Sequence, residues 1–189
     1  MIASATGDFD KAAAAALSRL GIDDAIEAPF GVFDFECVGP DGAVKWRESC
    51  RNIVTTVGKQ LLLDVGFGAT AKPSWFVLLK GAGTAAVGDT LATHAGWAEL
   101  AAGTAYTGSR PAISFGASTV YSTSGAQVAN GTAVSFSILV NGTVIAGAGL
   151  CTVATGTSGT LYNAGDFASS RTMGAGDTLN CTITIQQLP

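Results

Sequence analysis

The single histidine of the chain, His94, is the side chain best suited to acid–base chemistry near neutral pH. A Ser-His-Asp hydrolase would place it beside a nucleophilic serine, yet no Gly-X-Ser-X-Gly motif occurs near it. His94 instead follows a turn, in a setting of Gly, Ala and Thr. We therefore interpret His94 as a structural residue that helps to shape this turn.

Carboxylates are the next candidates, because a glycosidase needs two of them converging in a cleft. After residue 65 the chain offers only Asp89, Glu99, Asp166 and Asp177, and two of these belong to Gly-Asp turns. There is also no P-loop, and no Gly-X-Gly-X-X-Gly motif precedes a predicted helix. The sequence therefore predicts a protein that is not an enzyme and that uses no cofactor.

The four cysteines form no Cys-X-X-Cys pair, and with one histidine they make no zinc-binding pattern. They are Cys37, Cys50, Cys151 and Cys181. The N-terminus lacks the basic stretch and apolar core of a signal peptide. We expect free thiols in a protein made in the cytoplasm, with Cys151 and Cys181 as small core residues and no metal site.

The composition points to a protein with an unusually neutral surface. Charged residues make up 13% of the chain, hydrophobic residues 48%, and the net charge is −4. An acidic balance argues against a nucleic-acid or anionic-membrane partner, which would need a basic stripe. No apolar run approaches the roughly 18 residues of a membrane-spanning helix. The chain therefore either hides much surface in partners or relies on Ser, Thr and Gly for solubility.

Residues 8–20 have the spacing of a short amphipathic helix, with Asp8 as its cap and Gly21 as its stop. Its apolar face consists of Phe9, Ala13, Ala16, Leu17 and Leu20. This face is too thin to stabilise the helix alone in water, so it must dock on its own domain or on a neighbouring subunit. An acidic linker ending at Pro29 follows. We therefore divide the chain into an N-terminal arm, residues 1–29, and a β-sandwich domain, residues 30–189.

The domain opens with a predicted hairpin, in which residues 33–38 and 43–48 alternate about a Gly-Pro-Asp-Gly turn. Folding about that turn places Phe35 opposite Trp46 on the apolar side. On the other side it pairs opposite charges, Asp34 with Arg47 and Glu36 with Lys45.

Four further elements are predicted along the chain. Thr55 or Thr56 can cap a second short helix that runs to about Val65, with Val57, Leu61 and Leu62 on its apolar side. The apolar run from Trp75 is typical of a strand covered on both faces. Val-Gly-Asp-Thr-Leu at 87–91 is echoed by Ala-Gly-Asp-Thr-Leu at 175–179, and each is expected to turn and then start a strand.

The C-terminal half alternates like strands separated by turns. Residues 133–140 and 143–151 flank Asn141-Gly142, which predicts a hairpin with Phe136 opposite Gly147. Residues 178–186 form the last predicted strand. With about seven or eight short strands, the predicted fold is mainly β: an antiparallel, jelly-roll-like β-sandwich with an N-terminal helical arm and one further short helix.

Several segments together carry a family resemblance. They are Asn-Ile-Val-Thr-Thr-Val-Gly-Lys at 52–59, Trp-Phe-Val-Leu-Leu at 75–79, Gly-Asp-Thr-Leu-Ala-Thr-His-Ala-Gly-Trp at 88–97, Ser-Arg-Pro at 109–111 and Gly-Thr-Leu-Tyr at 159–162. In this order they resemble a family of tailed-bacteriophage virion structural proteins. The match runs from about Phe33 to Ile185, and residues 1–28 lie outside it.

The resemblance implies a capsid decoration or cement protein on the surface of the virion, made in the host cytoplasm. Such a protein would bind across seams between major capsid protein subunits and would associate with itself as a dimer or trimer. The alternative is a tail or fibre component that contacts the host receptor. A third reading, a host-encoded adhesin, is disfavoured by the missing export signal.

Large apolar and aromatic side chains are the candidate assembly contacts, because protein interfaces favour them. We expect these contacts at Phe9, Leu17, Leu20, Phe30, Trp97 and Tyr106. The other two tryptophans, Trp46 and Trp75, are interpreted as core residues.

Overall fold

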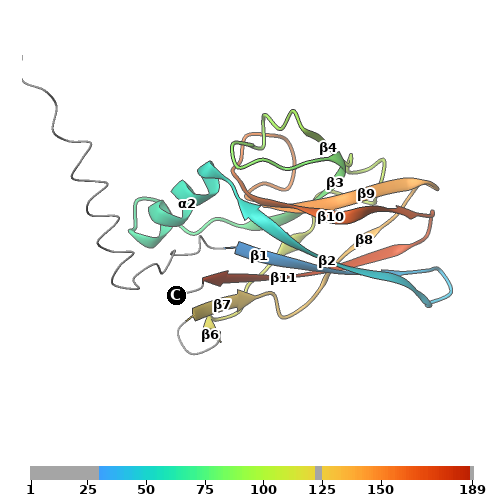
Figure 1. Cartoon of the computed structure of the whole chain (residues 1–189), viewed down its shortest axis with the longest axis horizontal. Coiled ribbons are helices and arrows are strands. Elements are labelled where there is room, and N and C mark those ends of the chain that lie inside the picture. Colours follow the sequence, from blue (N-terminus) through green and yellow to red (C-terminus); the bar gives the residue numbers. More distant parts are fainter. Residues whose placement is uncertain (1–29, 122–124, 188–189) are drawn as a thin grey trace, which may run out of the picture.

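The computed structural model describes residues 30–121 and 125–187, which fold mainly as antiparallel strands (Figure 1). The predicted N-terminal helix, with the rest of the arm, lies outside the described residues. The helix of the described part is α2 (Thr56–Gly66). The strands are β1 (Phe30–Val38), β2 (Val44–Val54), β3 (Trp75–Gly83), β4 (Trp97–Glu99), β5 (Ala112–Ile113), β6 (Thr119–Tyr121), β7 (Gly125–Ala129), β8 (Val134–Ser137), β9 (Thr143–Cys151), β10 (Leu161–Met173) and β11 (Thr178–Gln187).

These strands form one open 11-stranded sheet, in the order β4-β3-β9-β10-β2-β1-β11-β7-β6, with β5 on β3 and β8 on β11. Strand β2 joins the two parts of the sheet, because residues 46–51 pair with β1 and residues 52–54 pair with β10. Where β2 leaves β1, the buried Asn52 side chain accepts a hydrogen bond of 2.8 Å from the Gly31 N–H. The amide of Gly31 is therefore satisfied although the ladder has ended.

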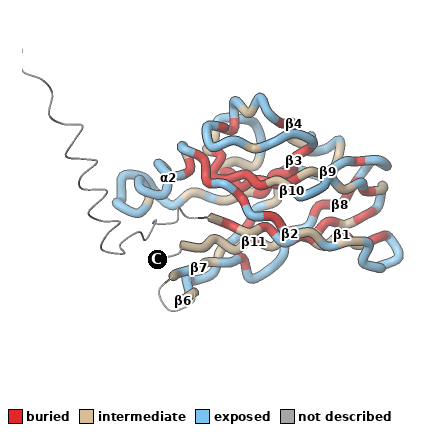
Figure 2. The backbone as a smooth tube through the Cα atoms, in the orientation of Figure 1, coloured by how far each residue is buried: buried red, intermediate tan, exposed pale blue. Residues whose placement is uncertain are grey.

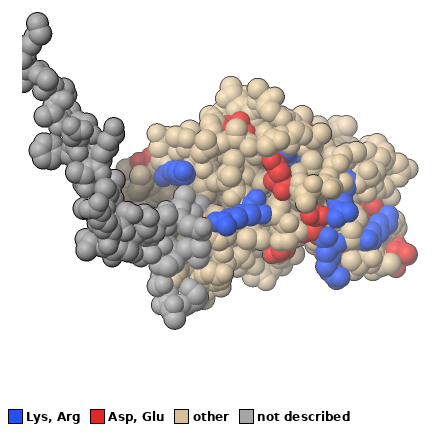
Figure 3. Space-filling model, viewed as in Figure 1, with Lys and Arg blue, Asp and Glu red and all other residues tan. Residues whose placement is uncertain are grey.

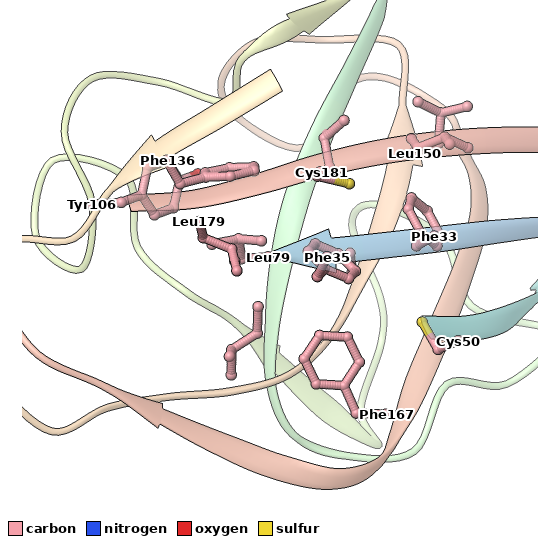
Figure 4. Close-up of a cluster of buried hydrophobic side chains, with 14 of the residues drawn as sticks. Phe33, Phe35, Cys50, Leu79, Tyr106, Phe136, Leu150, Phe167, Leu179 and Cys181 are labelled. Carbon is pink, nitrogen blue, oxygen red and sulfur yellow. The ribbon is translucent and has the colours of Figure 1, made fainter. Parts of the chain in front are cut away.

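Buried residues occur along strands in both parts of the sheet (Figure 2), and their side chains meet in one main core (Figure 4). Strands β1, β8 and β11 contribute from one part, and β3, β9 and β10 from the other. Among the members are Phe33, Phe35, Leu79, Phe136, Leu150, Phe167, Leu179 and Cys181. The rings of Phe35 and Phe167 meet edge to face, with centroids 5.0 Å apart. Strands that lie far apart in the order of the sheet thus bury their apolar side chains in a shared core.

The first hairpin forms, but its predicted register is wrong by two residues: Cys37, not Phe35, lies opposite Trp46. The ladder is irregular between Cys37 and Val38, and the Gly39 N–H closes the turn on the Ala43 carbonyl at 2.8 Å. A shift of two residues preserves the alternation of sides, so the same side chains still face the core.

The charge pairs of this hairpin change with its register. Arg47 lies opposite Glu36 and forms an ion pair with it, where the sequence predicted Asp34. Lys45, predicted to face Glu36, instead reaches Asp177 at the start of β11, with Nζ 2.6 Å from Oδ1. Asp177 lies in the turn before β11, so an argument that considered only the two strands of the hairpin could not place it beside Lys45.

The predicted hairpin about Asn141-Gly142 is wrong. Strand β8 pairs with β11, whereas β9 pairs with β10 and β3, so the turn leads from one part of the sheet to the other. Phe136 consequently lies opposite Leu179 rather than Gly147. Gly142 still adopts a φ of +79°, as a tight turn here requires. The local sequence predicted the tight turn correctly, but the pairing of β8 and β9 with other strands depends on distant segments.

Three other elements are confirmed. Helix α2 begins after Thr55, whose Oγ1 accepts a 3.0 Å hydrogen bond from the Gly58 N–H, as an N-cap should. Strand β3 lies between β9 and the short strands β4 and β5, and its residues 77–81 are buried. Strand β11 alternates as predicted, with Leu179, Cys181 and Ile183 fully buried.

Candidate interaction surface

The turn before His94 is held by Asp89 and Trp97. The Trp97 indole N–H donates to Asp89 Oδ2 at 2.8 Å, and the same oxygen accepts the Ala86 N–H at 2.8 Å. The His94 ring stacks on Trp97 with centroids 4.0 Å apart, and its Nδ1 lies 3.1 Å from the Trp97 carbonyl oxygen. The histidine and the carboxylate are thus engaged with Trp97, which supports a structural role for both.

The second Gly-Asp turn repeats this arrangement at the start of β11. The Asp177 side chain accepts the N–H of Gly174, three residues earlier, at 2.8 Å, just as Asp89 accepts that of Ala86. Strand β11 then starts at Thr178 as expected, but no strand starts at Thr90 in the first turn. The repeated Gly-Asp-Thr-Leu sequence therefore predicts the turn and its aspartate hydrogen bond, but it does not predict that a strand follows.

The surroundings of the Asp177 carboxyl lower its pKa. Its burial by itself would raise its pKa, but hydrogen bonds from Lys45 and the Gly174 amide, with the Lys45 charge, hold the pKa below the ordinary value. The same Lys45–Asp177 hydrogen bond raises the pKa of the Lys45 side chain. Burial, followed by the Asp177 charge, raises the pKa of the Cys37 thiol to about 11.

The fully buried Lys80 is neutralised by Asp166 of β10, with Nζ 2.8 Å from Oδ1. Its ammonium also donates to the carbonyl oxygens of Gly81 and Gly83, and lies 5.8 Å from the Trp97 ring centroid. Asp166 in turn accepts the Ala85 N–H at 3.0 Å. The pair ties the end of β3 to β10, and the lysine ammonium is already engaged by oxygen acceptors.

Arg110 and Glu99 form a two-pronged ion pair, with Nε–Oε1 and Nη2–Oε2 both 2.7 Å long. Arg110 Nη1 also donates to the carbonyl oxygens of Val153 and Gly156, at 3.1 and 3.0 Å. The 5% exposed guanidinium thereby ties β4 and the loop between β9 and β10 to the segment that precedes β5. Each of the four carboxylates that could have served a glycosidase is thus bound to structural donors.

Among residues 30–121 and 125–187, no three His, Cys, Asp or Glu side chains are grouped so that they could hold a metal ion. No helix within those ranges is long and apolar enough to cross a membrane. All four cysteines are unpaired and buried, which confirms the prediction of free thiols within this fold.

The predicted assembly contacts fall into three groups. Phe9, Leu17 and Leu20 lie outside the described residues. Phe30 is half-buried at the start of β1, with the Arg51 guanidinium carbon 3.6 Å from its ring centroid. Trp97 and Tyr106 are 6% and 0% exposed.

Burial of Trp97 and Tyr106 leaves them no side-chain surface to offer a partner in this conformation. The Tyr106 ring meets Phe136 edge to face at 5.0 Å, and burial raises the pKa of its hydroxyl to about 12. Both aromatic residues therefore serve the fold of the chain itself. The expectation of contacts through their side chains is not supported.

The most exposed large apolar side chains lie elsewhere, chiefly at the end of α2. Phe67, the C-cap residue, is 85% exposed and Leu63 is 60% exposed; we call these two residues the α2 tip. Val120 on β6 is 77% exposed. The only buried residue of α2 is Gly58. The sequence carried a signal for the tip, because Leu63 and Phe67 fall outside the predicted apolar face of the helix.

An apolar groove lies next to the tip, between α2 and the end of the sheet. It has a volume of about 230 Å³ and is lined by Leu62, Ser118, Ala126, Gln127, Val128, Tyr162, Ile185, Gln186 and Gln187. None of these residues is charged. On the face shown in Figure 3, charged side chains gather toward the β1–β2 turn at the opposite end of the molecule. The groove beside α2 is therefore an uncharged surface of the described domain.

No protein-family model matches the chain, and neither does any curated protein or solved structure.

Proposed function

We propose that this chain is a non-enzymatic structural protein of a bacteriophage virion, a capsid decoration or cement protein that stabilises the head. It would bind across seams between major capsid protein subunits and associate with itself as a dimer or trimer on the capsid surface. The proposal rests on the family resemblance of the sequence together with one structural observation, the exposed α2 tip.

The α2 tip supports an assembly role because aromatic side chains such as Phe67 are enriched at protein interfaces, and neighbouring exposed apolar side chains mark interaction sites. The charged clusters of the described residues are engaged within the fold, which leaves apolar contact as the main chemistry on offer. Each capsid contact could be weak, since many linked copies on one particle act together.

The proposal also includes a more specific description of the fold. We infer that the open sheet is folded into a two-layer β-sandwich with jelly-roll-like connections. Support comes from β2, which changes partner along its length, and from the core shared by the two parts of the sheet. A sandwich would leave its corners and α2 free for contacts between subunits.

The decisive experiment compares phage particles with and without this protein. Purified particles should contain it in a copy number comparable to that of the major capsid protein, as measured by quantitative mass spectrometry. Heads assembled without it should release DNA at a lower temperature or on treatment with a chelator, and adding the purified protein should restore resistance.

The copy number per particle also distinguishes a capsid decoration protein from the alternative, a tail or fibre component. A few copies per particle, located at the tail, would overturn the decoration proposal and favour a tail or fibre component. Such a component should also bind isolated host cells, which a cement protein should not do.

A further inference from the structure

The apolar groove beside α2 has no occupant among the described residues. Its apolar lining comes from Leu62 of α2, from Ala126 and Val128 of β7, and from Ile185 of β11. Figure 1 shows α2, β7, the start of β1 and the end of β11 at the same end of the molecule. A groove with this lining offers its occupant contact with α2 and with two strands.

A second feature of the groove is the side chain of Tyr162, which lines it and is only 2% exposed. Its hydroxyl has no hydrogen-bond partner, although buried hydroxyl groups normally have one. The ring itself is fixed, because it meets Trp75 edge to face at 5.4 Å. The Tyr162 hydroxyl is therefore an unsatisfied polar group of a residue that lines an otherwise apolar groove.

The described chain begins at this groove. Phe30, its first residue, pairs with Gln186, which lines the groove. The linker of residues 21–29 can span at most about 30 Å when fully extended, at roughly 3.3 Å per residue. The segment before it, residues 8–20, is about 20 Å long as a helix. The N-terminal segment can therefore reach the groove of its own chain without strain.

We propose that residues 8–20 bind this groove in the same chain as an amphipathic helix. Its apolar face suits the site, because small alanines allow close approach while Leu17 and Leu20 fill the space beside Leu62 and Ile185. The segment is too short to be a stable helix alone in water. A short tether gives it a millimolar effective concentration at the groove, which favours its own chain over a second copy.

The test uses the full-length protein alone and two variants that each add one negative charge. Leu17→Asp places the charge on the apolar face of the segment, and Ser18→Asp places it on the opposite face. Hydrogen–deuterium exchange is measured over residues 56–66 and 125–129. We expect Leu17→Asp to speed exchange there about tenfold, as loss of a local contact does, and Ser18→Asp to match the wild type.

Equal exchange in the wild type and Leu17→Asp would overturn the proposal. So would equal acceleration in both variants, which would mean that charge, and not the apolar face, matters. Thermal unfolding of the full-length wild type and of each full-length variant, followed in parallel, identifies any variant whose fold is damaged as a whole.

A cross-linking experiment then distinguishes the occupants. The double variant Leu20→Cys with Leu62→Cys should form a disulfide within one chain, seen as a monomer on a non-reducing gel, whereas Ser18→Cys with Leu62→Cys should not. A disulfide-linked dimer would overturn the proposal in favour of a second copy. Protection that appears only after phage heads are added would assign the groove to the capsid. Because the protein is tested alone, failure of the virion proposal leaves this result untouched.

Discussion

At the scale of single residues, the charged side chains of this domain mainly tie loops to strands. Asp177 links the first hairpin to β11 through Lys45, and Lys80 links β3 to β10 through Asp166. These contacts join segments far apart in the chain. Removing one partner should therefore disturb the stability of the whole domain rather than one turn.

Replacement of the Asp177 carboxylate should make stability less dependent on pH. Because the folded-state pKa lies below the ordinary value of 3.8, the carboxylate stabilises the fold above that pH, and the effect is lost as pH falls through the folded pKa. We expect Asp177→Asn to lower the free energy of unfolding by about 1.5–3 kcal/mol at pH 7. Urea unfolding at pH 7, 5 and 3 should show the difference from wild type narrowing at the lowest pH.

The control for this prediction is Asp64→Asn, because Asp64 is an exposed carboxylate of α2. It should change stability by less than about 0.5 kcal/mol at each pH. A deficit in Asp177→Asn that stayed constant from pH 7 to 3 would contradict the assignment.

The four thiols should be inert in the folded protein. Burial raises the pKa of Cys50 to about 12 and that of Cys37 to about 11, and it also raises those of Cys151 and Cys181. Reactivity requires the thiolate, which is scarce at pH 8 when the pKa is this high. Alkylation followed by intact mass measurement should give no adduct within minutes in native buffer and four adducts in denaturant. Rapid native labelling at any of them would contradict the burial.

At the scale of elements, α2 is held by its first turn and left exposed at its last. Thr55 caps the helix and donates from its hydroxyl to the Leu161 carbonyl at 2.5 Å. Gly58 packs directly on the backbone of Tyr162, where an added Cβ would lie 2.1 Å from the carbonyl oxygen. Gly66, in the last turn, has no such neighbour within 4 Å.

Alanine substitutions at Gly58 and Gly66 of α2 should therefore change the stability of the protein in opposite directions. Gly58→Ala should destabilise the protein by about 1–3 kcal/mol or more, because the backbone of β10 must move away. Gly66→Ala should be neutral or stabilising by up to about 1 kcal/mol, since alanine favours helix and meets open space. Thermal unfolding of both variants measures the contrast. Equal effects would show that α2 does not pack on β10 as described.

At the scale of the whole molecule, the domain presents exposed apolar side chains at the α2 tip and an uncharged groove beside them. If the protein decorates capsids, the α2 tip should carry much of the affinity. Phe67→Ser should weaken binding to heads that lack the protein about thirtyfold, the effect of losing one interface anchor. Co-sedimentation with such heads at increasing protein concentration measures this change.

The control is Val140→Ser, which removes another exposed apolar side chain, 49% exposed, from the loop before Asn141. It should bind heads as the wild type does. Equal loss in both variants would argue against a specific contact at the α2 tip, and unchanged binding of Phe67→Ser would exclude that residue as an anchor.

Much of the local structure followed from the sequence, because it depends on residues close together in the chain. The Thr55 cap, the buried run of β3, the alternation of β11 and the absence of cysteine pairs in the described fold are of this kind. Each arises from backbone and side-chain preferences that act over a few residues. The mainly β, antiparallel fold class followed from the same patterns.

Tertiary structure decided which strands pair and which aromatic side chains are left for partners. The register of the first hairpin, the separation of β8 from β9, and the burial of Trp97 and Tyr106 each depend on distant segments. Lys45 illustrates the reason. A hairpin pattern offers it only Glu36, but the turn before β11 brings the more buried Asp177 within reach. The α2 tip and the groove depend on how distant segments pack, because the other described residues leave that end of the helix uncovered.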